Sequence, residues 1–158
     1  MNLLLQTERL FTVKDKIIAF EIVLARLETS LLAIADFDIK ATETSWSKKE
    51  ILGHLVDSAI NNLQRFTEIQ HAAEPYRIRP YNQDELVKAN CYQHKNTQDL
   101  ITLLIALNRH IIYLVKNQTA VTLKYPIVLP NKTVTDLAFV IEDYFVHFYH
   151  HLNQITNK

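Results

Sequence analysis

The amino-acid sequence predicts an all-α fold, a four-helix bundle formed by a single domain over residues 1–158. The chain has only one Gly and four Pro, whereas a sheet-rich fold of this size needs many tight turns. Four long segments place apolar residues at the spacing of an amphipathic helix. Hydrophobic residues make up 48% and charged residues 22%, which suits a soluble domain that buries a sizeable core.

The first two helices are expected on either side of a polar stretch. The first runs from about Glu8 to Ile34, and its apolar stripe consists of Ile17, Phe20, Leu24, Leu27 and Leu31. The second begins after Ser47, because Ser47 and Glu50 form the Ser-x-x-Glu pattern of a capping box. The helical pattern of this segment ends near His71.

The middle of the chain predicts a loop, a short helix and a third long helix. Residues 72–81 contain Pro75 and Pro80 and are expected to form the loop. The Asn-Gln-Asp-Glu sequence that follows could cap a short helix over residues 82–90. The third long helix is expected over residues 97–117, where leucines recur at helical spacing.

A long connection precedes the last helix. Residues 119–131 predict an extended connection or a short hairpin, because β-branched residues surround Pro126 and Pro130. The fourth helix is expected to begin within residues 133–136 and to reach about Thr156. Four helices with this one long loop before the last of them make a bundle.

Charge and cysteine content indicate which partners and compartment to expect. Lys+Arg and Asp+Glu both number 17, whereas nucleic-acid binders usually carry a basic excess. The lone Cys91 excludes an internal disulfide framework, fits a reducing cytoplasm, and is expected to be a small buried residue. The first apolar run is too short for a signal peptide, and no stretch approaches 18 apolar residues. We therefore expect a cytoplasmic protein that binds neither nucleic acid nor a membrane.

Seven histidines are present, and the most informative are His147 and His151. At i, i+4 spacing on a helix they project from one face, so both can reach one ion. The pair is a weak motif, because neither His-Glu-x-x-His nor Glu-x-x-His occurs. A third ligand would come from another helix, and His54 is the candidate. His54 shares a polar row with Asp57 and Arg65, however, and periodicity alone favours a solvated face over a polar pocket.

Two motifs resemble those of the DinB-like (DinB/YfiT) superfamily. The sequence WSKKEILGHLVDS at residues 46–58 is similar to that family's pattern of a Trp, a capped helix start and a His-Leu-x-Asp-Ser run. The sequence DYFVHFYHHLNQI at residues 143–155 resembles its closing His-x-x-x-His-Leu-x-Gln-Ile segment. Residues 81–87 and 90–92 are similar to its linker region, so the resemblance covers nearly the whole chain.

The resemblance implies an up-down-down-up four-helix bundle with one divalent metal ion held by three histidines. By position these ligands are His54, His147 and His151. Three neutral imidazoles leave open coordination positions on the ion, as in catalytic sites. They do not identify the metal, which can be zinc, nickel, iron or manganese. The candidates to orient the imidazoles are Asp57, Tyr144 and Gln154.

The resemblance also implies an activity, because some members of the family are thiol S-transferases that use bacillithiol, mycothiol or glutathione-type thiols. We therefore expect a metal-dependent enzyme that acts on a small-molecule substrate, either by hydrolysis or by transfer of a low-molecular-weight thiol. The alternative is a non-catalytic metal- or ligand-binding bundle, such as a stress-response protein, since the sequence shows no clear general base beside the metal.

Two further groups of residues suggest contacts with a substrate and with a second subunit. Arg77 and Arg79 could bind an anionic substrate at the mouth of the bundle, although an exposed loop explains them as well. On the fourth helix, Phe139 and Val146 face away from the apolar stripe, with aromatic residues on its flank. Exposed apolar patches usually mark an interface, so we expect a homodimer unless the first helix or residues 119–131 cover this surface.

Overall fold

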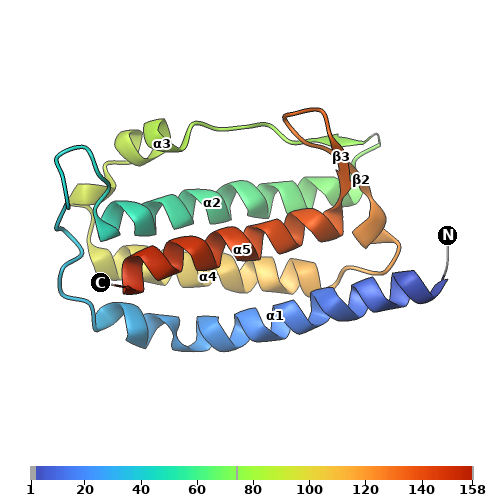
Figure 1. Ribbon diagram of the computed structural model, residues 1–158, viewed down its shortest axis with the longest axis horizontal. Helices are drawn as coiled ribbons and strands as arrows, with labels where there is room; N and C mark the ends of the chain where they lie inside the picture. Colours follow the sequence, from blue (N-terminus) through green and yellow to red (C-terminus); the bar gives the residue numbers. More distant parts are fainter. Residues whose placement is uncertain (1–2, 74, 158) are drawn as a thin grey trace.

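The computed structural model describes residues 3–73 and 75–157, with side chains described from residue 13 onward. Its four long helices are α1 (Leu3–Leu32), α2 (Lys48–Glu68), α4 (Thr97–Lys116) and α5 (Leu137–Thr156). Figure 1 shows that α1 and α5 run in one direction and that α2 and α4 run in the other. Helices α1 and α2 each pack against both α4 and α5. The predicted four-helix bundle with up-down-down-up order is confirmed.

Helix starts follow the capping signals in the sequence. The Ser47 side chain accepts a hydrogen bond from the Glu50 backbone N–H at 3.1 Å, and the Glu50 carboxylate accepts one from the Ser47 N–H at 2.8 Å. This is the predicted capping box of α2. Asn82 caps the short helix α3 (Gln83–Ala89), and Asn96 caps α4. Helix α1 begins at Leu3, before the Glu8 expected from the apolar stripe.

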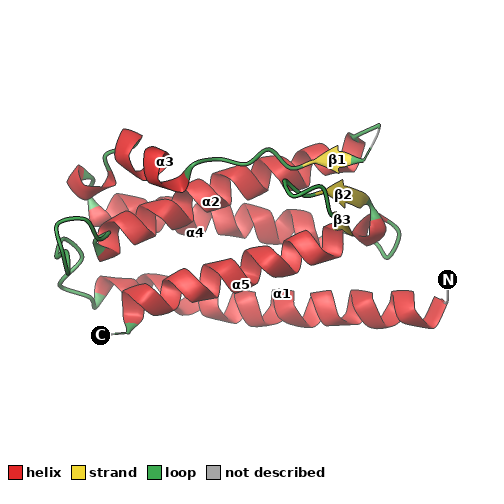
Figure 2. Cartoon of the chain, turned by 45° about the horizontal axis from the view of Figure 1, so that its top comes forward, coloured by secondary structure: helices red, strands yellow, loops and turns green. Residues whose placement is uncertain are grey.

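A small sheet joins the two long connections at one end of the bundle (Figure 2). Its strands are β1 (Tyr76–Arg77), β2 (Pro126–Val128) and β3 (Val134–Asp136). Strand β1 pairs in parallel with β2, and β2 pairs antiparallel with β3. Three single turns of 3-10 helix complete the chain: η1 (Ile69–His71), η2 (Tyr92–His94) and η3 (Thr122–Lys124).

The sheet corrects two expectations. Strand β1 lies inside residues 72–81, which were expected to be a loop. Strand β3 occupies the place where the fourth helix was expected to start, because Val134 and Thr135 pair with β2. Helix α5 begins only at Leu137, where the side chain of Asp136 accepts a hydrogen bond from the Phe139 N–H at 3.0 Å.

The apolar stripes of the four helices meet in one core. Phe20 of α1 packs against Phe145 and Phe148 of α5, with ring centroids 4.6 and 4.8 Å apart. Helix α4 is, by length and composition, apolar enough to cross a membrane, with a mean hydropathy of 1.3 over its best window. The helix is not an uninterrupted apolar run, because Asn108, Arg109 and His110 lie in its middle. Its Leu104 and Ile111 are fully buried in the bundle, which accounts for the apolar character of α4.

The lone cysteine also differs from expectation. Cys91 is exposed and takes a left-handed backbone conformation, with φ of 53°. It forms the junction between α3 and the 3-10 turn η2, where the chain must change direction sharply. The prediction that Cys91 is a buried core residue was wrong.

Candidate metal centre

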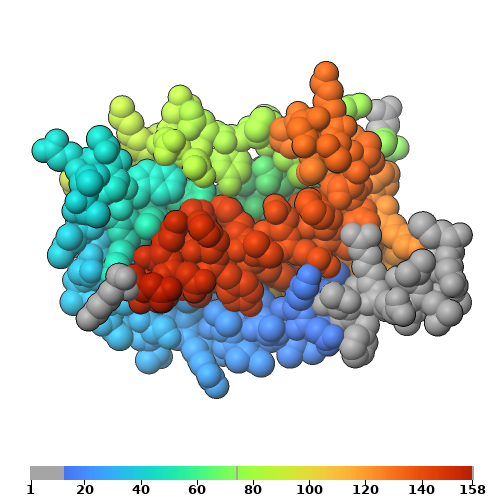
Figure 3. Space-filling model, in the orientation of Figure 1, coloured from blue at the N-terminus to red at the C-terminus, as the bar shows by residue number. Residues whose placement is uncertain are grey.

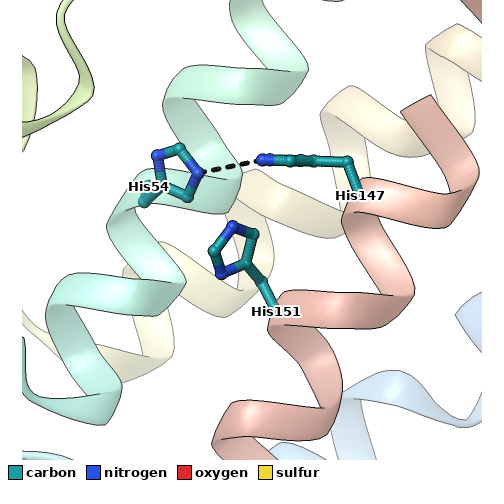
Figure 4. A group of neighbouring side chains, drawn as sticks. All are labelled: His54, His147 and His151. Carbon is teal, nitrogen blue, oxygen red and sulfur yellow. Dashed lines mark hydrogen bonds between the residues drawn. The ribbon is translucent and has the colours of Figure 1, made fainter. Parts of the chain in front are cut away.

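Three histidines from two antiparallel helices converge on one point (Figure 4). The ring centroid of His54 on α2 lies 5.1 Å from that of His147 and 4.6 Å from that of His151, both on α5. The His147 and His151 rings are 4.6 Å apart. One nitrogen of each ring lies within 4.8 Å of the other two, and the described residues contain no other such group of possible ligands. We refer to these three residues as the histidine triad.

His54 is buried, with only 1% of its surface exposed. The periodicity of α2 alone favours a solvated polar face at this position, whereas a ligand supplied to the pair on the last helix has to be buried in the bundle. The expectation of a buried His54 is confirmed. Its ring lies beside Trp46 and beside both histidines of α5. Because α3 and η2 pack on α2 in addition to α4 and α5, every residue from Leu52 to Ala59 is buried. His54 and Asp57 of the polar row therefore lie inside the protein, whereas Arg65 at its end is half-buried.

Hydrogen bonds on the outer side of the triad turn the Nε2 atoms inward. The Nδ1–H of His151 donates to the Gln154 side-chain oxygen at 2.8 Å, and the Gln154 amide donates to His150 at 3.2 Å. The Nδ1 of His147 lies 3.4 Å from the Ser58 hydroxyl. Gln154 thus contacts a triad histidine as expected. Ser58 was not singled out, although it stands one turn after His54 in the His-Leu-x-Asp-Ser motif.

The other two candidates for orienting the imidazoles have different hydrogen-bond partners. The Tyr144 hydroxyl donates to the Asn108 side-chain oxygen of α4 at 2.6 Å. One oxygen of Asp57 accepts from the Tyr92 hydroxyl at 2.6 Å and from the Asn90 amide at 2.9 Å. Its other oxygen and the Nδ1 of His54 are the two buried side-chain polar atoms without a partner among the described residues. Asp57, one turn from His54, remains a candidate to orient that ring.

The single glycine explains how Tyr92 reaches Asp57. Gly53 lies in the middle of α2, directly before His54, where glycine costs about 1 kcal/mol relative to alanine. A Cβ at this position would stand 2.1 Å from the Cγ of Tyr92. The absence of a side chain lets the Tyr92 ring lie against the helix backbone, which brings its hydroxyl to the carboxylate.

Burial keeps the triad histidines neutral. The pKa of His54 is lowered to about 4, first by burial and then by the neighbouring charges of His151 and His147. Burial, followed by His151 and His150, lowers the pKa of His147 to about 4. The pKa of His151 is also lowered, mainly by burial. Near pH 7 all three rings are therefore in the neutral form that ligates metals.

The donor set fits one divalent ion. Histidine nitrogens bind zinc at about 2.0–2.1 Å, so two of them on a tetrahedral ion lie about 3.4 Å apart. The Nε2 atoms of His54 and His147 are 3.1 Å apart. Two neutral nitrogens so placed, on rings held by hydrogen bonds or burial, are well arranged to share a cation.

The triad lies between two hollows of the surface. The smaller, of about 120 Å³, adjoins His147 and is lined on the α2 side by Ser58 and Arg65, among others. The larger and more open, of about 430 Å³, adjoins His151 and is lined by Trp46, whose ring centroid lies 5.2 Å from that of His54. Solvent and small molecules therefore have access to the triad from both sides.

Arg77 and Arg79, expected near the mouth of the bundle, lie next to the smaller hollow. They line a neighbouring depression of about 220 Å³. Arg65 and Tyr81 line both the depression and the smaller hollow, so the two adjoin each other. The three arginines thus gather on one side of the triad, although only Arg77 and Arg79 had been considered as substrate contacts.

Comparisons with known proteins agree with this fold. The chain matches the DinB superfamily over residues 19–155. It is 26% identical over 133 residues to a Halalkalibacterium halodurans protein named as a candidate metal-dependent hydrolase, covering 83% of this chain and 77% of the relative. YfiT from Bacillus subtilis, described as a probable metal-dependent hydrolase with an unusual four-helix bundle topology, has a TM-score of 0.80 at 23% identity. That likeness covers 91% of this chain and 83% of YfiT.

A more distant structure has the same fold within a longer chain. The mycothiol-dependent maleylpyruvate isomerase has a TM-score of 0.69 at 10% identity, covering 89% of this chain but only 59% of the isomerase. At these identities the two structural likenesses show the fold alone. The family match includes all three triad histidines and both motifs that carry the resemblance. The chain therefore belongs to the DinB superfamily.

Proposed function

We propose that this protein is a metal-dependent enzyme that acts on a small molecule, with His54, His147 and His151 as the ligands of one divalent ion. The observation that carries the proposal is the convergence of three neutral imidazoles from two packed helices between two accessible hollows. The described residues add no fourth histidine, cysteine or carboxylate to this group. Three protein ligands with open positions are typical of catalytic sites, whereas structural sites are closed.

The side chains around the triad have separate tasks in this proposal. The ion, when bound, supplies a Lewis acid that lowers the pKa of a water molecule or thiol enough to give a nucleophile near neutral pH. The Gln154 side-chain oxygen accepts a hydrogen bond from the Nδ1–H of His151 and so fixes the tautomer of that ring. The Ser58 hydroxyl is placed to do the same for His147. Trp46 covers His54 and shields that ring from water.

Two reaction classes fit the proposal, namely hydrolysis and thiol S-transfer to an electrophile. The names of the H. halodurans relative and of YfiT support hydrolysis, and the name of the isomerase supports the use of a thiol. The larger hollow beside His151 is roomy enough for a second small molecule, which S-transfer requires and hydrolysis does not. Zinc, nickel, iron and manganese all accept imidazole ligands.

A non-catalytic metal-binding bundle is the alternative. It is favoured by one observation: no carboxylate of the described residues forms a hydrogen bond with a triad histidine. Metal binding without turnover of any substrate would support this second function.

Metal analysis of the purified protein, followed by a screen of thiols and electrophiles, tests the proposal. We expect one ion per chain, and turnover of a thiol with chlorodinitrobenzene or of a simple ester. His54→Ala should lose both the ion and the activity. His110→Ala is a matched control, because His110 is exposed on α4 outside the triad. Wild-type protein that binds no divalent ion would refute the proposal.

We further propose that the protein works in the cytoplasm as a homodimer. Its exposed lone thiol suits a reducing compartment. Helix α5 forms much of the near surface in Figure 3, and on it Val146 is 66% and Phe139 43% exposed. Phe145, by contrast, is covered by α1. Burying the exposed pair against a second copy would remove apolar surface from water.

A further inference from the structure

Arg65 stands at the end of a second line of polar side chains on α2, which leads away from the triad. His54, Ser58, Asn62 and Arg65 follow one another at three- to four-residue spacing on one face of α2. At a rise of about 1.5 Å per residue, the Cα of Arg65 is about 16 Å along the helix from that of His54. The last three side chains line the hollow that adjoins His147. One hollow thus connects a triad histidine with a guanidinium group.

The Arg65 guanidinium is held in place by neutral partners only. It lies over the Tyr81 ring at 5.6 Å from the centroid. Its two Nη atoms donate to the Asn62 side-chain oxygen at 3.4 Å and to the Arg79 carbonyl at 3.1 Å. No carboxylate of the described residues forms an ion pair with it. Its position is fixed while its charge and further N–H donors stay free for a ligand.

The charges around the hollow favour a ligand with a single negative charge. Three cationic and two anionic side chains line this hollow or the depression beside it: Arg65, Arg77 and Arg79, and Glu68 and Asp143. The divalent ion of the proposed function would add to this positive balance. Asp143 lines the hollow itself, so it would oppose a dianion such as phosphate more strongly than a carboxylate.

The volume and the walls of the hollow limit the size of the ligand. A cavity of about 150 Å³ holds benzene, so about 120 Å³ admits a group of comparable or slightly smaller size. Ile78, Leu129 and Val140 line it beside the polar row and suit a short alkyl chain. We infer that the hollow binds the carboxylate end of an aliphatic substrate, with Arg65 pairing the carboxylate. This inference rests on the proposed function, because it places the reacting end of that substrate at the triad.

Three thiols of equal length test the inference by titration calorimetry on the metal-loaded protein. They are 6-mercaptohexanoic acid, 6-mercapto-1-hexanol and 6-amino-1-hexanethiol. The thiol of each probe can ligate the ion, and the far end carries a negative, a neutral or a positive polar group. We expect the acid to bind about tenfold tighter than the alcohol, as a hydrogen bond to a charged group provides, and the amine to bind most weakly.

Variants identify the residue responsible. Arg65→Met should remove the preference for the acid and leave the affinity for the alcohol unchanged, and Arg65→Lys should restore part of the preference. Arg109→Met is the matched control, because Arg109 lines a separate hollow between α1 and α4. Asp143→Asn should raise the affinity for the acid.

Two kinds of failure can be told apart in the same samples. If the protein takes up no metal, the proposed function is refuted. If the metal-loaded protein binds acid and alcohol equally, or binds none of the three probes, the inference about Arg65 is overturned. The inference also fails if Arg65→Met keeps the preference for the acid while metal content stays at one ion per chain.

Discussion

Removing the metal ion should lower the melting temperature of this protein by about 5–11 °C without unfolding it. The triad exists only when α2 and α5 are packed together, so the ion binds the folded chain and stabilises it by mass action. At a metal concentration of 100 times the dissociation constant, this contribution is about 2.7 kcal/mol. A domain of 158 residues shifts by about 2–4 °C per kcal/mol, which gives the expected range.

The apo protein should stay helical because its core does not depend on the ion. Phe20, Phe66 and Phe148 are fully buried among the apolar stripes, and the triad lies to one side of them. Circular dichroism melts of protein stripped with a chelator, and of the same protein with metal restored, measure the shift. His54→Ala should show no shift on adding metal, and the control His110→Ala should show the full shift.

Three results would contradict this reasoning. A wild-type melt that does not respond to any divalent metal would exclude a site in the folded protein. An equal shift in His54→Ala would place the ion outside the triad. An apo protein without helical signal would mean that the ion is structural, and that the apolar core is too weak to hold the bundle by itself.

Three other predictions follow from the triad, the glycine and the surface of α5. Without metal, stability should fall as the pH drops from about 6.5 to about 4, by at most about 1.4 kcal/mol per pH unit for each of His54 and His147. Both histidines have their pKa lowered to about 4 in the folded protein, so in that window the unfolded chain binds protons and the folded protein does not. Urea titrations at several pH values measure the slope of stability against pH, and a flat profile would contradict the prediction. Gly53→Ala should destabilise the protein, because overpacking against Tyr92 costs about 1–3 kcal/mol and alanine returns only about 1 kcal/mol of helix propensity. Denaturant midpoints test this loss, which should shrink in a Tyr92→Ala background. Val146→Glu should convert the dimer into a monomer, as measured by light scattering. A wild-type protein that is monomeric at tens of micromolar would contradict the proposed homodimer.

Helix positions could be predicted from the sequence because their signals are local. Ser47 and Glu50 are three residues apart, and the hydrogen bonds of the capping box depend on little else. The small sheet could not be predicted in the same way. Tyr76 pairs with Ile127 across some fifty positions, so the two-residue strand β1 exists only because a distant strand lies beside it.

The candidate site was predictable in parts for the same reason. The His147 and His151 pair is visible as a spacing on one helix, and the resemblance of the motifs supplied His54. The burial of His54 depends on Trp46 and on the two histidines of α5, whose rings lie beside its own, and periodicity within α2 cannot reveal these contacts. Arg65 was seen only as a member of a polar row, because its place in the hollow depends on Tyr81 and Arg79 from another segment.

The antiparallel contact of α2 with α5 also sets the order of events when the protein is made. His54 and His147 are 93 positions apart, and they meet only after the chain has closed that long loop. Before then, the nascent chain offers at most the local pair on α5, since a helix forms within about a microsecond and long-range docking takes far longer. Tight metal capture must therefore wait until α2 and α5 have docked. The ion therefore stabilises the bundle after these two helices have docked and cannot act as its folding nucleus.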